Sequence, residues 1–226
     1  MIRKSIYIWI AALFLLSQLT PRGAFSITVS EEEKMGRSML RYIYQHYEII
    51  DDPAVVEYVN KVGNRIVEGL EDPLFNYRFH VINVDAYNAF AIPAGYIFIN
   101  SGLMAAMDSE EELAGILAHE IAHVNARHIS QKIERSKKIG WASMAGMAAG
   151  ILIGAAGGGD AAQAVTKGSQ AAGAAAELSY SRDNEIQADQ LGLIYLTDAG
   201  YSAKGLLKIL TKMRSKQWFD TEQVPT

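Results

Sequence analysis

The chain has 226 residues, of which 50% are hydrophobic and 20% are charged, and this composition excludes a wholly disordered protein. Its net charge of −4 gives no basic surplus for binding nucleic acid. The absence of cysteine excludes a disulfide scaffold, a thiolate metal site and a cysteine nucleophile. Imidazole chemistry therefore depends on five histidines: His46, His80, His119, His123 and His128.

The first 26 residues are typical of a secretory signal peptide. Arg3 and Lys4 precede a charge-free apolar run over residues 6–16, which is short for a membrane span. Ala24 and Ser26 then place small residues before a cleavage position. The alternative is an uncleaved amphipathic or membrane anchor. Both interpretations predict that the remainder, residues 27–226, is exported.

Two helices are predicted after this leader. Ser30 and Glu33 fit a capping box, which predicts a helix that continues to about Tyr47. Pro53 follows Asp52 and favours the start of a second helix, which ends near residue 69.

Three short strands are predicted next, over residues 77–84, 88–92 and 96–99. Turn-forming Pro93 and Gly95 lie between the second and third strands. A second capping box, from Ser109 to Glu112, begins a long helix. Helices, a small sheet and further helices in this order predict an α+β fold with an antiparallel sheet.

Residues 119–123 read HEIAH and match the H-E-x-x-H metal-binding pattern. Positions i and i+4 lie on one face of a helix, so His119 and His123 can both reach one zinc ion. Glu120 then lies beside a zinc-bound water as the catalytic carboxylate. A helical wheel places Leu117 and Ile121 on an apolar back and both histidines on a polar front, with His128 on the apolar side.

Glu185 and Asp189 are the strongest candidates to complete this site. They are also spaced i and i+4, so Glu185 can be the third ligand while Asp189 accepts the second N–H of a ligand histidine. The alternative is a solvated acidic pair on an exposed helix. The upstream HEIAH motif favours the metal site.

Three segments together resemble the M48 metallopeptidases, the group that includes Ste24-like and HtpX-like proteases. The matching segments are NAFAIPAGYIFINSGLM (88–104), EEELAGILAHEIAHVNARH (110–128) and SRDNEIQADQLG (181–192). The resemblance implies a mainly helical, zincin-like domain over residues 27–226 that binds one Zn²⁺ per chain. It implies His119, His123 and Glu185 as ligands and Glu120 as the catalytic residue.

The resemblance also suggests a function. It is greatest to exported bacterial members that act in envelope protein quality control, and it implies an endopeptidase whose substrates are unfolded or misassembled proteins. Residues 88–92 would be an edge strand at the border of the cleft, where an extended peptide can add by main-chain hydrogen bonds. Asn88 is therefore a candidate substrate contact, and Arg182 a candidate for stabilising the oxyanion or for a salt bridge.

Residues 139–176 are rich in glycine and alanine, and residues 139–158 carry no charge. A single membrane span there would place His119 and His123 on one side of the membrane and Glu185 on the other. The three residues could not then bind the same metal ion, so a single span is excluded. The segment is predicted to be a lid, a membrane-surface contact or a packed helical insertion.

Two other functions compete with the protease. A non-catalytic zinc-stabilised chaperone or scaffold predicts that Glu120 is lost, whereas it is present. A latent form would instead be held closed by the glycine-rich segment over the cleft. A membrane-associated module over residues 132–158 predicts lipid binding without zinc. His128 is expected to be a hydrogen-bonded structural residue, and no role is predicted for His46 or His80.

Overall fold

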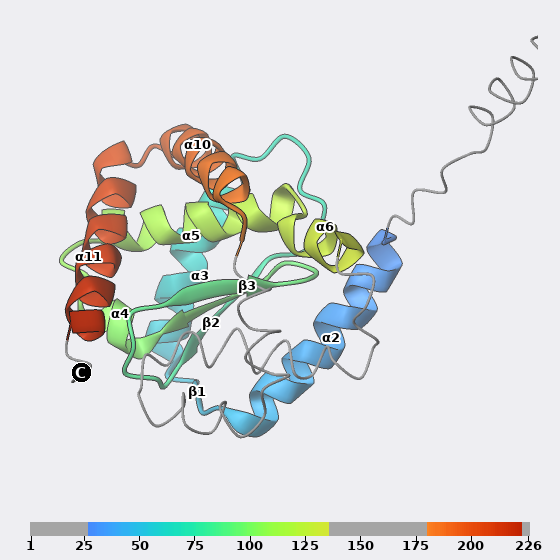
Figure 1. Ribbon diagram of the computed structural model, residues 1–226, viewed down its shortest axis with the longest axis horizontal. Coiled ribbons are helices and arrows are strands. Elements are labelled where there is room, and N and C mark those ends of the chain that lie inside the picture. The colour runs from blue at the N-terminus through green and yellow to red at the C-terminus, as the bar shows by residue number, and fades with distance from the viewer. Residues whose placement is uncertain (1–26, 136–179, 223–226) are drawn as a thin grey trace, which may run out of the picture.

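The computed structural model describes residues 27–135 and 180–222, which form helices around one four-stranded sheet (Figure 1). The elements are α2 (Val29–His46), β1 (Ile49–Ile50), α3 (Pro53–Val67), β2 (Arg78–Ile82), β3 (Ala89–Ile92), β4 (Tyr96–Asn100), α4 (Ser101–Ala105), α5 (Glu110–Asn125), α6 (His128–Arg135), α10 (Arg182–Asp198) and α11 (Ala203–Glu222). The predicted α+β class is confirmed. The predicted signal peptide and the 139–176 insertion lie outside the described residues, among whose helices none could cross a membrane.

The sheet has the order β1-β2-β4-β3 and is mixed. β3 and β4 form the expected antiparallel hairpin, whose turn has positive φ at Ala94 (71°) and Gly95 (83°). β1 is also antiparallel to β2, but β2 and β4 run parallel, which corrects the expectation of a wholly antiparallel sheet. The physical reason is the continuous apolar run of β4: it is buried throughout and takes a central position, which leaves β3 at the edge.

Alternate residues of β4 belong to two different cores. Ile97 and Ile99 lie in the core shared with α3 and α5. Tyr96 and Phe98 lie in a second core shared with α2, which covers the opposite face of the sheet (Figure 1). Because successive side chains of β4 point to opposite faces of the sheet, this one strand connects α2 to the rest of the domain.

Both predicted capping boxes differ from the structure in detail. Thr28 caps α2, and its hydroxyl and backbone N–H both bond Glu31, so the box lies two residues before the predicted one. Ser109 is the N-cap of α5, but its side chain makes no cap hydrogen bond. The buried carboxylate of Glu112 instead accepts a hydrogen bond from Lys212 of α11 at 2.6 Å.

Helix α5 is buried on all sides from Glu112 to Val124, so its predicted polar front is covered by other helices. Glycines permit this close packing. A Cβ at Gly192 of α10 would lie 3.2 Å from Cα of His119, and one at Gly115 of α5 would lie 2.5 Å from the backbone N of Leu206 in α11. Helix α10 therefore crosses α5 close to the first histidine of HEIAH.

Candidate metal centre and active site

Two histidines of α5 present their Nε2 atoms to one another. The Nε2 atoms of His119 and His123 lie 3.0 Å apart, and both side chains are buried. One turn of helix separates the two residues, as the i, i+4 spacing predicts. Two imidazole nitrogens at this distance require a shared proton or a shared cation between them.

Helix α10 brings Glu185 to the same point. Its carboxylate lies 3.5 Å from Nε2 of His119 and 3.8 Å from Nε2 of His123. Because the side chain of Glu185 is 46% exposed, the site is open to solvent on the side of α10. The structure thus brings together the three residues predicted as ligands.

The donor set fits a zinc ion. Bonds of about 2.0–2.2 Å at tetrahedral angles place neighbouring zinc ligands roughly 3.3–3.5 Å apart. The three pairs of donor atoms are separated by 3.0, 3.5 and 3.8 Å, and all three donors lie within 4.8 Å of one another. Two neutral imidazoles and one carboxylate are also a donor set that catalytic zinc sites use.

Asp189 completes the surroundings of His119. Its Oδ1 lies 3.1 Å from Nδ1 of His119, so Nδ1–H faces a carboxylate and Nε2 keeps its lone pair for a metal. Burial lowers the pKa of His119, but hydrogen bonds to Asp189 and Glu185 and the charges of Glu120 and Glu185 outweigh it and raise the pKa to about 10. The site therefore attracts positive charge.

His123 is held neutral. Burial, and to a lesser extent the charges of His119 and His128, together lower its pKa to about 2. A neutral imidazole is the form that binds a metal.

Glu120 lies beside the ligands but is not one of the three clustered donors. It is 5% exposed, and its Oε2 has no hydrogen-bond partner among the described residues. Burial raises its pKa to about 7, although the charge of His119 and a hydrogen bond from the backbone of Ala91 lower it. A carboxylate with a pKa near neutrality can both accept and return a proton at physiological pH.

The free edge of β3 lies next to this carboxylate. The backbone N–H of Asn100 donates to the carbonyl of Asn88, so even-numbered residues of β3 bond β4 and odd-numbered ones face away from it. The backbone groups of Ala89 and Ala91 therefore point to the open edge. No second strand pairs with β3 in the described part of the chain.

Two further predicted site residues lie at the margins. Asn88 is half-buried just before β3. Its backbone carbonyl already accepts a hydrogen bond from Asn100, so a contact with substrate would have to be made by its side chain. Arg182 is exposed at the first residue of α10, and no contact among the described residues joins it to the two histidines.

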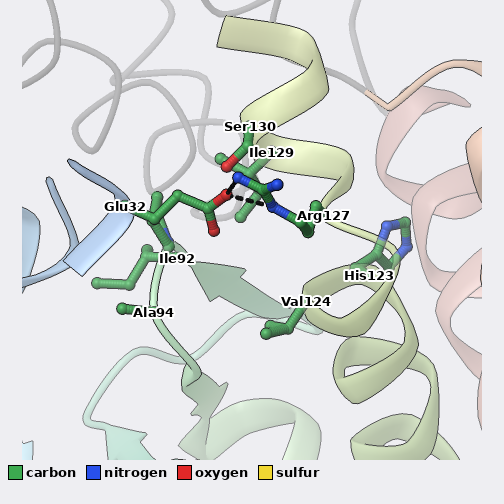
Figure 2. A pocket seen from close by; sticks show the side chains of 9 residues that line it. Glu32, Ile92, Ala94, His123, Val124, Arg127, Ile129 and Ser130 are labelled. Atoms are coloured by element: carbon green, nitrogen blue, oxygen red, sulfur yellow. Dashed lines mark hydrogen bonds and ion pairs between the residues drawn. The ribbon is translucent and has the colours of Figure 1, made fainter. Parts of the chain in front are cut away.

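A small pocket extends from His123 to the end of β3 (Figure 2). One wall is the ion pair between Arg127 and the buried Glu32, and Ile92 and Val124 contribute apolar surface. Glu32 of helix α2 and the candidate ligand His123 therefore line the same pocket.

The sequence pattern of peptidase family M48 matches residues 53–222, which include every residue of the candidate site. The chain belongs to peptidase family M48. His119, His123, Glu120 and Glu185 thus lie within a metallopeptidase domain, and the family resemblance of the sequence is confirmed.

Several proteins whose sequences are similar to this M48 chain are named as proteases or metalloendopeptidases. It is 30% identical over 200 residues to the "Putative beta-barrel assembly-enhancing protease" of Vibrio cholerae, covering 88% of this chain and 41% of the relative. It is 29% identical to the "Beta-barrel assembly-enhancing protease" of Escherichia coli K12, covering 83% of this chain and 38% of the relative. The "Mitochondrial metalloendopeptidase OMA1" of Schizosaccharomyces pombe is 38% identical over 84 residues, 36% of this chain and 24% of the relative. The chain spans about two-fifths of the length of the first two relatives.

The M48 site contains two residues that the sequence analysis missed. The ring of Tyr180 stacks on His123 with centroids 3.9 Å apart, and Gln187 hydrogen-bonds His128. Tyr180 is near in sequence to Glu185, which is the only signal that could have indicated it. Gln187 lies between the two acidic residues of α10 and has an unremarkable polar side chain.

His128 is hydrogen-bonded, as expected, but it does not point away from His123. Helix α5 ends at Asn125, and Arg127 has φ 55°, so the wheel of α5 does not extend to residue 128. Nδ1 of His128 lies 2.9 Å from Nδ1 of His123. The other two histidines lie elsewhere: His46 is the last residue of α2, with Nδ1 2.8 Å from the carbonyl of Tyr42, and His80 stacks on Phe98.

Proposed function

We propose that this M48 protein is a zinc-dependent endopeptidase that cleaves unfolded or misassembled proteins of the cell envelope. The observation that carries the proposal is the convergence of His119, His123 and Glu185 on one point, beside the buried carboxylate of Glu120, whose Oε2 has no hydrogen-bond partner among the described residues. His119 and His123 would bind one Zn²⁺ through Nε2, and Glu185 through its carboxylate.

Glu120 is the proton carrier in this proposal. Zinc, when bound, supplies a Lewis acid that polarises the scissile carbonyl and lowers the pKa of water. Glu120 accepts a proton as water attacks the carbonyl carbon and then gives it to the leaving amine. Its buried position and its pKa of about 7 suit both steps at neutral pH. The hydrogen bond from Ala91 orients the carboxylate for them.

Substrate would bind as an additional strand on β3. The outward N–H and C=O groups of Ala89 and the C=O group of Ala91 offer main-chain hydrogen bonds to an extended peptide, while the N–H of Ala91 donates to Glu120. Such pairing requires an extended backbone rather than a particular sequence, so unfolded segments are favoured. The Asn88 side chain would contact the substrate near the start of β3, and Arg182 would approach the oxyanion from α10.

The names of the relatives support the substrate class. Two of them are named for assembly of β-barrels, which are proteins of outer membranes. The predicted signal peptide at residues 1–26 supports an exported, periplasmic location for this chain. Its action on envelope proteins is proposed on these two grounds together.

The test compares the wild type with Glu120→Gln and with Glu57→Gln, an exposed control on α3. Zinc content and casein cleavage are measured on the same preparations. We expect about one zinc per chain in all three and a loss of cleavage by two orders of magnitude or more, ~10²–10⁴-fold, in Glu120→Gln alone. Zinc without cleavage in any of them would favour the scaffold instead, and no zinc in any of them would exclude the metal site.

A further inference from the structure

A chain of hydrogen bonds runs outward from His123 and ends at the surface of α10. Nδ1 of His123 lies 2.9 Å from Nδ1 of His128, and Nε2 of His128 lies 3.0 Å from Oε1 of Gln187. His123 and His128 are fully buried, whereas Gln187 is exposed. Three helices, α5, α6 and α10, each contribute one member.

The number of protons fixes the direction of this chain. A metal on Nε2 of neutral His123 leaves its single proton on Nδ1, which must donate to His128. Nδ1 of His128 is then an acceptor, so the proton of neutral His128 lies on Nε2 and donates to Oε1 of Gln187. Each bond has one donor and one acceptor only in this arrangement.

We infer that Gln187 is a positioning residue for the metal centre: it accepts from Nε2–H of His128 and thereby holds His123 in the tautomer and orientation that bind the metal. This inference rests on the zinc site of the proposed function. Gln187 would not bind the metal itself but would orient a residue that does.

The backbone between α5 and α6 makes this contact possible. In an uninterrupted helix, residues 123 and 128 would lie about 140° apart around the axis. The left-handed conformation of Arg127 changes the direction of the chain after α5, and His128 contacts His123. Nε of Arg127 donates to the buried Glu32 of α2 at 2.6 Å, which holds this turn in place (Figure 2).

The two ligand histidines therefore have different supports. Nδ1 of His119 faces the carboxylate of Asp189, while Nδ1 of His123 faces a neutral imidazole that is itself held by a neutral amide. A carboxylate partner raises the basicity of an imidazole more than a neutral acceptor does. A hydrogen-bond acceptor at position 187 thus sets the direction of the hydrogen bonds between His123 and His128. A negative charge on that acceptor would increase the affinity for the metal.

Substitution of Gln187 tests this without disturbing the core, because its side chain is exposed. We compare full-length wild type, Gln187→Met, Gln187→Glu and the matched control Gln190→Met, an exposed glutamine on the same helix. The readout is the zinc dissociation constant, measured by competition with a chelating dye. We expect Gln187→Met to weaken zinc binding about tenfold. Gln187→Glu, which keeps an acceptor, should bind zinc at least as tightly as wild type, and Gln190→Met should equal wild type.

The tautomer of His128 gives a second, independent readout. Long-range ¹H–¹⁵N correlation spectra of the zinc-loaded protein, labelled with ¹⁵N-histidine, are expected to show the proton of His128 on Nε2. In Gln187→Met this signal should shift or broaden by exchange, whereas Gln190→Met should leave it unchanged.

Several outcomes would overturn the inference. A proton on Nδ1 of His128 in the wild type would do so, as would equal zinc affinities in Gln187→Met and wild type, or equal losses in Gln187→Met and Gln187→Glu. A wild type that binds no zinc would remove both this inference and the proposed function. A wild type that binds zinc without cleaving casein would contradict the proposed function alone, and the comparison among variants would still decide the role of Gln187.

Discussion

Asp189 and Glu185 contact opposite nitrogens of the same imidazole, that of His119. Oδ1 of Asp189 lies 3.1 Å from Nδ1, and Oε2 of Glu185 lies 3.5 Å from Nε2. One turn of α10 separates the two carboxylates, so a single helix contacts both nitrogens of the ring.

Replacement of Asp189 by Asn should weaken zinc binding by roughly 10–100-fold. Asn keeps an oxygen that accepts from Nδ1–H of His119 but loses the negative charge that makes the imidazole a stronger ligand. Chelator competition measures the dissociation constant. Asp183→Asn, at an exposed position of α10, is the control and should bind zinc as the wild type does. Equal affinities for wild type and Asp189→Asn would show that the carboxylate does not support the ligand.

Zinc should stabilise the folded wild type and should not stabilise Glu185→Gln. A ligand that binds only the folded state at 100 times its dissociation constant adds about 2.7 kcal/mol to the free energy of unfolding. Without the Glu185 carboxylate, two histidines remain, and the bound ion lacks its anionic ligand. Thermal melts with zinc and with a chelator measure the difference. If both proteins gained the same stability from zinc, Glu185 would not be a ligand.

Lys212→Met should destabilise the fold by about 3–5 kcal/mol, because it leaves the buried carboxylate of Glu112 without its cation. Nζ of Lys212 lies 2.6 Å from Glu112, which is fully buried, and also donates to the carbonyl of Ala106 at 2.8 Å. Urea unfolding measures the loss. Lys208→Met, exposed on the same helix, should change stability by less than about 0.5 kcal/mol. Adding Glu112→Gln to Lys212→Met should recover part of the loss, and its failure to do so would assign the effect to packing.

His80 should make the fold less stable in mild acid. Burial and the charge of Arg78 lower its pKa from 6.5 to about 4, so the unfolded chain binds the proton more tightly than the folded one. The stability that the neutral ring supports is present above pH 6.5 and is lost as the pH falls from 6.5 towards 4. Between pH 7 and pH 5 the loss should be about 1–2 kcal/mol.

Comparison with His80→Phe isolates this effect, since phenylalanine can keep the stacking of His80 on Phe98. Both proteins are unfolded with urea at pH 7 and pH 5 in the presence of a chelator, so that the histidines of the metal site titrate alike in each. The wild type should lose more stability than His80→Phe over this interval. Parallel losses in the two proteins would show that His80 does not titrate as described.

Local patterns in the sequence predict the parts of the site that lie within one turn of helix. The spacing of His119 and His123, and that of Glu185 and Asp189, places each pair on one face before anything is known of the tertiary structure. That the two pairs lie together was predicted from chemistry, because a catalytic zinc ion needs three protein ligands and HEIAH supplies two. The structure brings the four residues together through the close crossing of α10 and α5 at Gly192.

Features set by distant contacts could not be predicted in this way. The position of His128 depends on the turn at Arg127, which is held by Glu32, 95 residues earlier in the chain. The parallel pairing of β2 and β4 depends on which strand takes the centre of the sheet, and a period-two pattern in one strand does not specify its neighbour. A helical wheel likewise cannot show that the chain leaves the helix after Asn125.

Helix α2 precedes the segment that matches the family pattern, yet it is part of the same folded unit. It covers the sheet face that carries Phe90 and Phe98, and its Glu32 pairs with Arg127 in the turn after α5. A protein trimmed to residues 53–222 would keep every proposed ligand but would expose an aromatic sheet face to water and leave Arg127 without its counterion. The smallest part of the chain that folds on its own is therefore expected to begin before residue 53, where the match to the family pattern starts.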